Sequence, residues 1–390
     1  MRSHVISAIA LVFRLRSAEE LLRAMEQSGK LEVEPNSVVR VRAMLNTTFM
    51  CAVKVRNMGV ASWTLAALLA RGAHPDAHRL GEMAAAAAEL HDAPACCEAV
   101  AAHAAHPAVG ASGARLDEGT LVAALDCAAR TKHARLEDLA WRGVEAAAAA
   151  RGGPPSVASF ASVVASRSSR AALDAAFDAL AQLGAAHPGA DGDAAVLAPL
   201  VGAVCGAAEA LDGAYYVLEA RAQRGLPVSP AQLNAVVAAC SQAGDVVRAF
   251  ETFDAFASLG ATPDVGTYNA LLAGCMWHGR AAAAPQLVAA MRAAGVQPDD
   301  TTVALEIDAA LAVGDAATAL ARIEEAAAAG RALRRDTVRR LLAHVTRHGT
   351  HNGLNRVLAA VNKLGLVNMR GLAAARMASR AAAMTAPPVL

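Results

Sequence analysis

The sequence contains few aromatic residues. Only 3% of its 390 residues are Phe, Trp or Tyr, while alanine runs such as residues 84–88 and 326–329 are frequent. Thin helices with alanine faces can pack closely, whereas a thick globular core is usually filled by larger side chains. The composition therefore favours thin layers of helices over one thick core.

Sequence motifs of enzymes are missing as well. There is no Cys-x-x-Cys pair, Gly-rich phosphate loop or Gly-x-Ser-x-Gly segment, and the acidic residues are scattered instead of clustered. His103 and His106 stand near Cys96 and Cys97, but no third well-spaced ligand follows, so ordinary helix surface is the better interpretation. The sequence predicts no enzyme, no metal, no cofactor and no small-molecule substrate.

Long apolar runs and a disulfide pattern are also lacking. No apolar run approaches the ~20 residues needed to cross a bilayer, because Arg, Gly or an acid interrupts every long alanine stretch. Seven cysteines, of which Cys205, Cys240 and Cys275 are evenly spaced, do not form a disulfide framework. We expect core cysteines in a reducing compartment, and no membrane partner.

What the sequence does contain is a period of 35 residues. One series of glycines stands at 225, 260, 295, 330 and 365, and a second at 244, 279, 314 and 349. The pairs Asn234 and Asn269, and Asp264 and Asp299, keep the same step. A fixed period with two apolar segments in each unit indicates a stack of helical hairpins.

The glycines mark the two turns of each hairpin. The 244 series follows the first helix, where a left-handed C-cap suits glycine, and the 225 series ends the second helix before a proline-containing link. Ala214, Ala249, Ala284 and Ala319 share one place early in the second helix, where a small side chain allows close packing. The predicted fold is an all-α α-solenoid, a superhelix of antiparallel helical hairpins with about ten repeats. Its predicted parts are degenerate repeats over 1–194, regular repeats at 195–229, 230–264, 265–299, 300–334 and 335–369, and a basic C-terminal tail over 370–390.

In the first 194 residues the period becomes irregular. Breaks near residues 35, 75, 116 and 154 predict about five units of 36 to 41 residues, with the extra residues in longer loops. Residues 1–16 contain three arginines and no acid. They are interpreted as the first helix of the first repeat, in preference to the remnant of an organelle transit peptide.

Charge is distributed unevenly although the net charge is only +1. Residues 331–390 contain eleven basic residues and one acid, a net charge of +10, and the other 330 residues have a net charge of −9. Such a basic end suits phosphate binding, whereas an acidic surface repels RNA. A solvated helix face or an acidic protein partner is the alternative. The predicted phosphate contacts are Arg331, Arg334, Arg335, Arg339, Arg340, Arg347, Arg356, Lys363 and Arg370.

One unit resembles a known repeat. Residues 265–299, from Val265-Gly266-Thr267-Tyr268-Asn269 to Gln297-Pro298-Asp299, resemble a pentatricopeptide repeat, the motif of organelle RNA-binding proteins. The tetratricopeptide repeat, with a period of about 34 residues, is the main alternative. The resemblance implies single-stranded RNA as partner and an organelle matrix or stroma as location, with the mitochondrion favoured over the chloroplast.

The resemblance also implies where bases are selected. In this family a polar residue early in the first helix and the last residue of the unit together select one base. Carried over, Asn234 pairs with Asp264 and Asn269 pairs with Asp299, and both pairs imply uracil. Asn and Asp also favour helix caps and turns, so an architectural role is the alternative.

Three functional readings follow. The favoured one is a non-enzymatic RNA-binding adaptor, associated with an organellar ribosome or another ribonucleoprotein. It contacts organellar rRNA or mRNA through its basic C-terminal repeats, and the protein subunits of that assembly are further partners. The first alternative is a structural scaffold whose acidic N-terminal repeats dock on protein partners. The second is a free, transcript-specific factor for RNA stability or translation.

Overall fold

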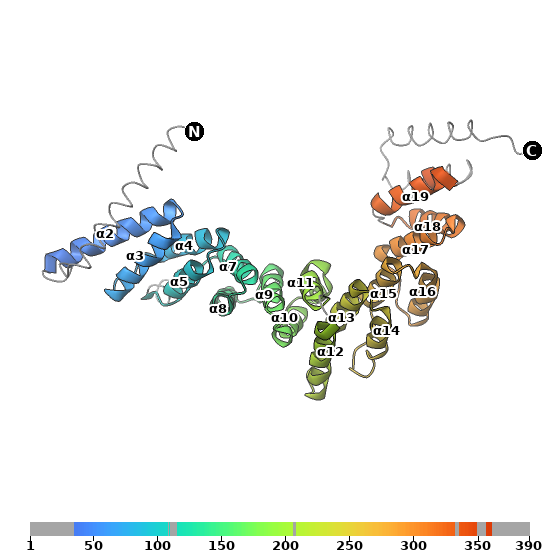
Figure 1. The fold of residues 1–390 in the computed structure, drawn as a ribbon, viewed down its shortest axis with the longest axis horizontal. Coiled ribbons are helices and arrows are strands. Elements are labelled where there is room, and N and C mark those ends of the chain that lie inside the picture. The colour runs from blue at the N-terminus through green and yellow to red at the C-terminus, as the bar shows by residue number, and fades with distance from the viewer. Residues whose placement is uncertain are drawn as a thin grey trace, which may run out of the picture. The chain divides into compact units, whose positions relative to one another are not determined.

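The computed structural model describes residues 35–107, 109, 115–205, 208–331, 335–348 and 356–360. The chain divides into two compact units, residues 1–200 and 201–390. Within the described residues every regular element is a helix, as Figure 1 shows. The prediction of an all-α α-solenoid is confirmed. The glycines at 349 and 365, the segment 1–16 and the whole of the basic tail at 370–390 lie outside the described residues.

The N-terminal unit is a series of helix pairs. The members of a pair pack on each other, and the first helix of each pair also packs on the first helix of the next. α2, α4, α7 and α9 are the first helices, and each starts at or just after a break that the sequence shows. The helices are α2 (Pro35–Lys54), α3 (Met58–Ala70), α4 (Ala77–Glu89), α5 (Ala93–Ala104), α7 (Glu118–Thr131), α8 (Ala134–Arg151), α9 (Val157–Ser169) and α10 (Leu173–Ala186), followed by the short turn η1 (Ala190–Gly192) and by α11 (Ala194–Val204), which runs into the second unit.

The C-terminal unit repeats the same pattern with a regular step. α13, α15, α17 and α19 pack one on the next as a layer of first helices, and α14, α16 and α18 pair with them. The helices are α12 (Ala208–Gln223), α13 (Pro230–Ala243), α14 (Val246–Asp254), α15 (Val265–Trp277), α16 (Ala284–Ala293) after the short turn η2 (Ala281–Ala283), α17 (Asp300–Ala312), α18 (Ala316–Ala328) and α19 (Arg335–His348).

Left-handed backbone closes the turns in both units. In the C-terminal unit the described glycines of both series have positive φ, for example 87° at Gly244 and 79° at Gly295. In the N-terminal unit the turn between the two helices of a pair keeps this conformation without glycine, at Arg56, His91, Lys132 and Ala171, with φ between 56° and 59°. A non-glycine residue in this region costs about 1 kcal/mol. The N-terminal hairpins therefore keep the turn although the glycine signal is gone.

Small residues set the spacing inside the hairpins. Ala214, Ala249, Ala284 and Ala319 are all buried, as are Cys240 and Cys275, while Cys205 is half-buried. At Gly274 in α15 an added β-carbon would lie 2.6 Å from Cβ of Ser241 in α13, so glycine permits the close approach of these helices.

Three side chains lie elsewhere than the sequence suggests. Val247 belongs to an apolar segment but is 60% exposed, because the buried face of α14 is formed by Val246, Ala249 and Thr252, three residues apart. Cys96 and His103 were expected on an ordinary helix surface and are instead buried in α5, because this helix packs against α3, α4, α7 and α8. Burial raises the pKa of Cys96 to about 12 and lowers that of His103. No group of three or more metal-ligating side chains occurs among the described residues.

In the described part of the chain, no single helix combines the length and the apolar composition of a membrane span. Only α11 taken together with residues 209–223 of α12, a pair bent by 119°, meets the length and composition of a span.

Candidate nucleic-acid interface

Two clusters of polar side chains stand 35 residues apart in the C-terminal unit. In the first cluster, Asn234 in α13 donates from Nδ2 to Asp264 Oδ1 at 2.9 Å and accepts at Oδ1 from the Thr267 hydroxyl at 2.6 Å. In the second, Asn269 in α15 donates to Asp299 Oδ1 at 3.1 Å and accepts from Thr302 at 2.7 Å. The same three residue types make the same contacts in both, so the arrangement belongs to the repeat.

Helix capping holds the Asp and Thr of each cluster in place. Asp264 is the N-cap of α15, where it accepts from the Thr267 backbone N–H at 2.9 Å, and the Thr267 hydroxyl accepts from the Asp264 N–H at 3.0 Å. Asp299 and Thr302 form the same capping box at the start of α17. The architectural role that the sequence left open is therefore present, and it positions the asparagine of the preceding repeat.

The asparagine amides are held in place by hydrogen bonds but keep part of their hydrogen-bonding capacity. An amide has two N–H donors and two acceptor lone pairs, and each cluster uses one of each. One donor and one acceptor remain side by side, which complements the edge of a base that offers an acceptor next to a donor. The two clusters differ in exposure, since Asn234 is only 5% exposed while Asn269 is half-buried. Asn269 is thus the better presented of the two.

The carboxylate of the second cluster favours the ionised form. Burial raises the pKa of Asp299, but hydrogen bonds from the Thr302 backbone, the Thr302 hydroxyl and the Asn269 amide outweigh it, and the pKa lies below its usual range. A lowered folded-state pKa means that the cap stabilises the fold above the unfolded-state pKa. That contribution is lost as the pH falls through the folded-state value.

The threonines were missing from the predicted site residues. Each stands three residues after the cap aspartate, and this Asp-x-x-Thr spacing before an apolar helix is the signature of a capping box. That signature was the signal that could have identified Thr267 and Thr302.

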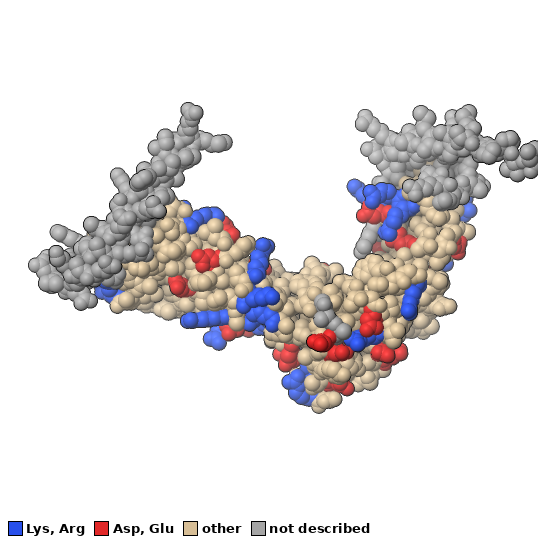
Figure 2. Space-filling model, viewed as in Figure 1, with Lys and Arg blue, Asp and Glu red and all other residues tan. Residues whose placement is uncertain are grey.

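Several of the predicted phosphate contacts have acidic neighbours. Arg340 in α19 lies 2.6 Å from Asp308 in α17, and Arg356 makes two hydrogen bonds of 2.8 and 2.7 Å to Glu324 in α18. Arg331 donates to the carbonyl of Pro298 at 2.9 Å and lies 3.8 Å from Asp300. On the face drawn in Figure 2, basic side chains of the last described helices lie beside acidic ones. These three arginines therefore have partners within the repeats.

Two of the predicted arginines remain more open. Arg339 is 80% exposed and lies 3.2 Å from Asp336, one turn away on the same helix and itself exposed, and Arg335 is exposed at the start of α19. An exposed pair of this kind contributes little to stability. Arg347 lies in α19, and Arg334, Lys363 and Arg370 fall outside the described residues.

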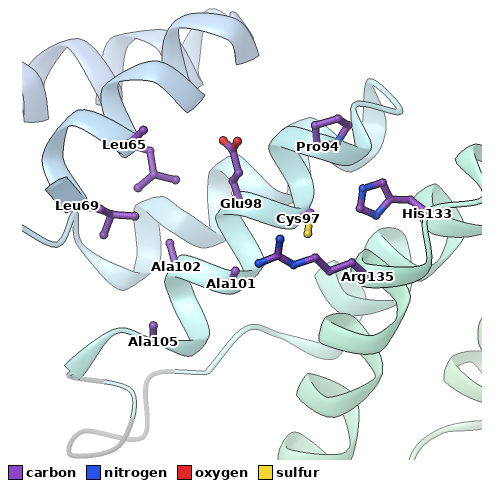
Figure 3. Close-up of a pocket in the computed structure, with 11 residues that line it drawn as sticks. Leu65, Leu69, Pro94, Cys97, Glu98, Ala101, Ala102, Ala105, His133 and Arg135 are labelled. Carbon is purple, nitrogen blue, oxygen red and sulfur yellow. The ribbon is translucent and has the colours of Figure 1, made fainter.

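The N-terminal unit carries a groove of about 540 Å³ between α3, α5 and α8. Figure 3 shows Leu65 and Leu69 on one side and His133 with Arg135 on the other, while Glu98 and Cys97 come from the helix between them. The lining is mostly apolar, with one acidic and one basic side chain. The groove has no counterpart of the Asn–Asp–Thr clusters.

Comparisons with known proteins agree on one repeat type. A model of the PPR repeat family matches residues 263–309, which contain the second cluster, and a model described as pentatricopeptide repeat-containing protein matches residues 118–256. Over these residues the chain is built of pentatricopeptide repeats. No curated protein matches it in sequence.

Solved structures with a similar course of the chain include two of PPR10. The crystal structure of PPR10 with an 18-nt psaJ RNA element is 17% identical, with a TM-score of 0.40 over 90% of this chain and 53% of that one. The crystal structure of PPR10 from maize is 18% identical, with a TM-score of 0.38 over 90% of this chain and 52% of that one. The PPR domain of Arabidopsis thaliana protein-only RNase P 1 with tRNA is 17% identical, with a TM-score of 0.37 over 44% and 90%. The chain spans about half the length of the PPR10 chain.

Proposed function

We propose that this protein is a non-enzymatic RNA-binding adaptor. It holds a short single-stranded segment, and the Asn269 and Asn234 amides read two adjacent bases. The observation that carries the proposal is the repeated Asn–Asp–Thr cluster, because a fixed amide with one free donor and one free acceptor is suited to a base edge. The family assignment supports RNA as the ligand.

Uracil is the base that the family resemblance implies for these amides, and its edge is compatible with them. Its Watson–Crick edge places an N–H donor between two carbonyl acceptors, so one side of it matches an amide oxygen and an amide N–H group. The cap aspartate keeps the amide from rotating and so fixes which of its atoms faces which base atom. A rotated amide would present the opposite pattern.

Affinity in this proposal comes from the exposed part of the basic end. Arg335 and Arg339 contact phosphates, while Arg340 and Arg356 serve the packing of the last helices. The setting we propose is an organellar ribosome or another ribonucleoprotein, in the mitochondrion in preference to the chloroplast, with the acidic repeats facing protein subunits.

A protein-binding scaffold is the second candidate. The internal pairing of Arg331, Arg340 and Arg356 and the apolar groove of the N-terminal unit favour it. The scaffold and the adaptor differ in the salt dependence of binding. RNA binding through phosphates releases counterions and is therefore weakened by salt, whereas a protein contact in the groove releases none.

Salt dependence tests the proposal. The affinity of the full chain for a short uridine-rich single strand should fall steeply between 50 and 200 mM salt, with each lost phosphate contact lowering the log–log slope by ~0.7. The double variant Arg335→Ala/Arg339→Ala is therefore expected to flatten the slope by about 1.4. Fluorescence anisotropy at several salt concentrations measures this.

The matched control removes two positive charges from the N-terminal unit, as Arg56→Ala/Lys132→Ala. It lowers the net charge equally and should leave the slope close to that of the parent. A flat slope in the parent protein, or equal flattening in the two double variants, would contradict the phosphate contacts and favour the scaffold.

A further inference from the structure

A second site lies at the junction of the repeats 265–299 and 300–334. It is a cavity of about 300 Å³ between the end of α16, the link that follows it, and helices α17 and α18. Three arginines and two glutamates face it, together with small and apolar side chains. The lining consists of Arg292, Gln297, Pro298, Val303, Glu306, Arg322, Glu325, Ala326, Ala329 and Arg331.

The preceding junction is filled at the corresponding positions. Exactly one period earlier stand Tyr268, Leu271, Leu287 and Met291, and all four are buried. In the later junction these positions hold Val303, Glu306, Arg322 and Ala326. The changes from Tyr to Val and from Met to Ala remove side-chain volume, and the changes from Leu to Glu and from Leu to Arg introduce charge. Solenoid packing requires neither change, because the four corresponding residues one repeat earlier are apolar or aromatic and are buried.

Glu306 is the least satisfied group in this cavity. Its Oε2 atom is buried and has no hydrogen-bond partner among the described residues. Burial raises the pKa of Glu306, and the nearby charges of Arg322 and Arg292 lower it in part. A buried carboxylate oxygen without a donor is costly to keep, so a donor supplied from outside would be bound favourably.

The arginines of the cavity supply hydrogen-bond donors, whereas Glu306 needs one. Arg322 is paired with Glu325 at 2.5 Å, Arg331 donates to the Pro298 carbonyl, and Arg292 completes the basic side of the cavity. A guanidinium has five N–H donors, so an arginine with one partner can still bind phosphate oxygens. The cavity is therefore complementary to a ligand that has an anionic group at one end and an N–H donor at the other.

We propose that this junction cavity binds a single nucleotide, with its phosphate on Arg292, Arg322 and Arg331 and a base N–H group on Glu306. A volume of about 300 Å³ lies at the lower end of the range for small-molecule sites and suits one nucleotide. The nucleotide is either free in solution or the 5′-phosphorylated end of an RNA. The site uses none of the residues of the Asn–Asp–Thr clusters, so this proposal can be tested independently of the proposed base selection.

Equilibrium dialysis of the full chain with labelled cytidine 5′-monophosphate tests the proposal, with ribose 5-phosphate and inorganic phosphate as probes that lack the base. We expect cytidine monophosphate to bind at least tenfold more tightly than ribose 5-phosphate, since a hydrogen bond to a buried carboxylate is charge-assisted. Glu306→Leu should abolish that difference. Arg322→Leu should weaken both ligands tenfold or more.

The two leucine variants restore the residue types found one period earlier, at Leu271 and Leu287, so they are expected to keep or raise the melting temperature. Loss of binding in them is therefore not loss of folding. Asn269→Ser should bind cytidine monophosphate as the parent does, which separates this site from the proposed base reader.

The source of the nucleotide is decided by competition. If a 5′-phosphorylated oligonucleotide displaces labelled cytidine monophosphate and the same oligonucleotide without the phosphate does not, the cavity binds an RNA end. If neither oligonucleotide displaces it, the cavity binds a free nucleotide. Absence of binding, equal binding of cytidine monophosphate and ribose 5-phosphate, or unchanged binding in Arg322→Leu would overturn the proposal.

Discussion

Replacing Glu137 with alanine is expected to lower the free energy of unfolding by about 3–5 kcal/mol, the usual cost of removing one partner from a buried ion pair. Glu137 in α8 is only 2% exposed. Its carboxylate accepts from Arg167 Nε at 3.0 Å and from the Ser166 hydroxyl at 2.7 Å, both in α9, and from Arg170 at the C-cap of that helix. Without it, two largely buried guanidinium groups lose their anion.

Urea unfolding followed by circular dichroism measures this loss. The control is Glu89→Ala, which removes a carboxylate from an exposed pair with Arg56 in the same unit, where both side chains are more than half exposed. That variant should cost about 1 kcal/mol or less. Similar losses in the two variants would show that the buried cluster does not join the two hairpins as we describe.

Replacing Asp299 with alanine is expected to weaken binding of a uridine-containing strand about tenfold or more, because each well-oriented contact to a base edge is worth about 1–3 kcal/mol. The variant removes the acceptor that fixes the Asn269 amide. It also removes the N-cap of α17, at a cost of about 1 kcal/mol in stability.

Asp315→Ala separates these two effects. Asp315 is the N-cap of α18 and accepts from the backbone and hydroxyl of Thr318, the same Asp-x-x-Thr pattern as at Asp299, but no asparagine of a preceding repeat reaches it in the described structure. Both variants should lose a similar amount of stability. Only Asp299→Ala should lose RNA affinity in fluorescence anisotropy, and equal affinities would make the second cluster purely architectural.

The fold of the C-terminal half was predictable because the physical requirement and the residue type coincide there. A left-handed turn is least costly with glycine, so each repeat shows one at its two turns. In the N-terminal half the same conformation is carried by Arg56, His91, Lys132 and Ala171, which leave no pattern in the sequence. The breaks at prolines and aspartates still located the helix starts, since capping depends on local residue types.

The candidate site was predictable only in part. The spacing of Asn234 from Asp264 and of Asn269 from Asp299 located two side-chain pairs that the structure joins by hydrogen bonds. Their use in base selection stays a prediction. The pairing of Arg340 with Asp308 and of Arg356 with Glu324 could not be read from net charge, because charge counts do not show which helices face each other.

The most direct test of the account is the base preference of Asn269→Ser. Affinities are measured for a set of short strands that differ at one nucleotide, for the parent, for Asn269→Ser and for Asn234→Ser. We expect the parent to prefer uridine at two adjacent positions, and each variant to reduce the preference about tenfold at its own position while leaving the other unchanged. A parent without base preference, or variants that keep the preference of the parent, would contradict the claim that these amides read RNA.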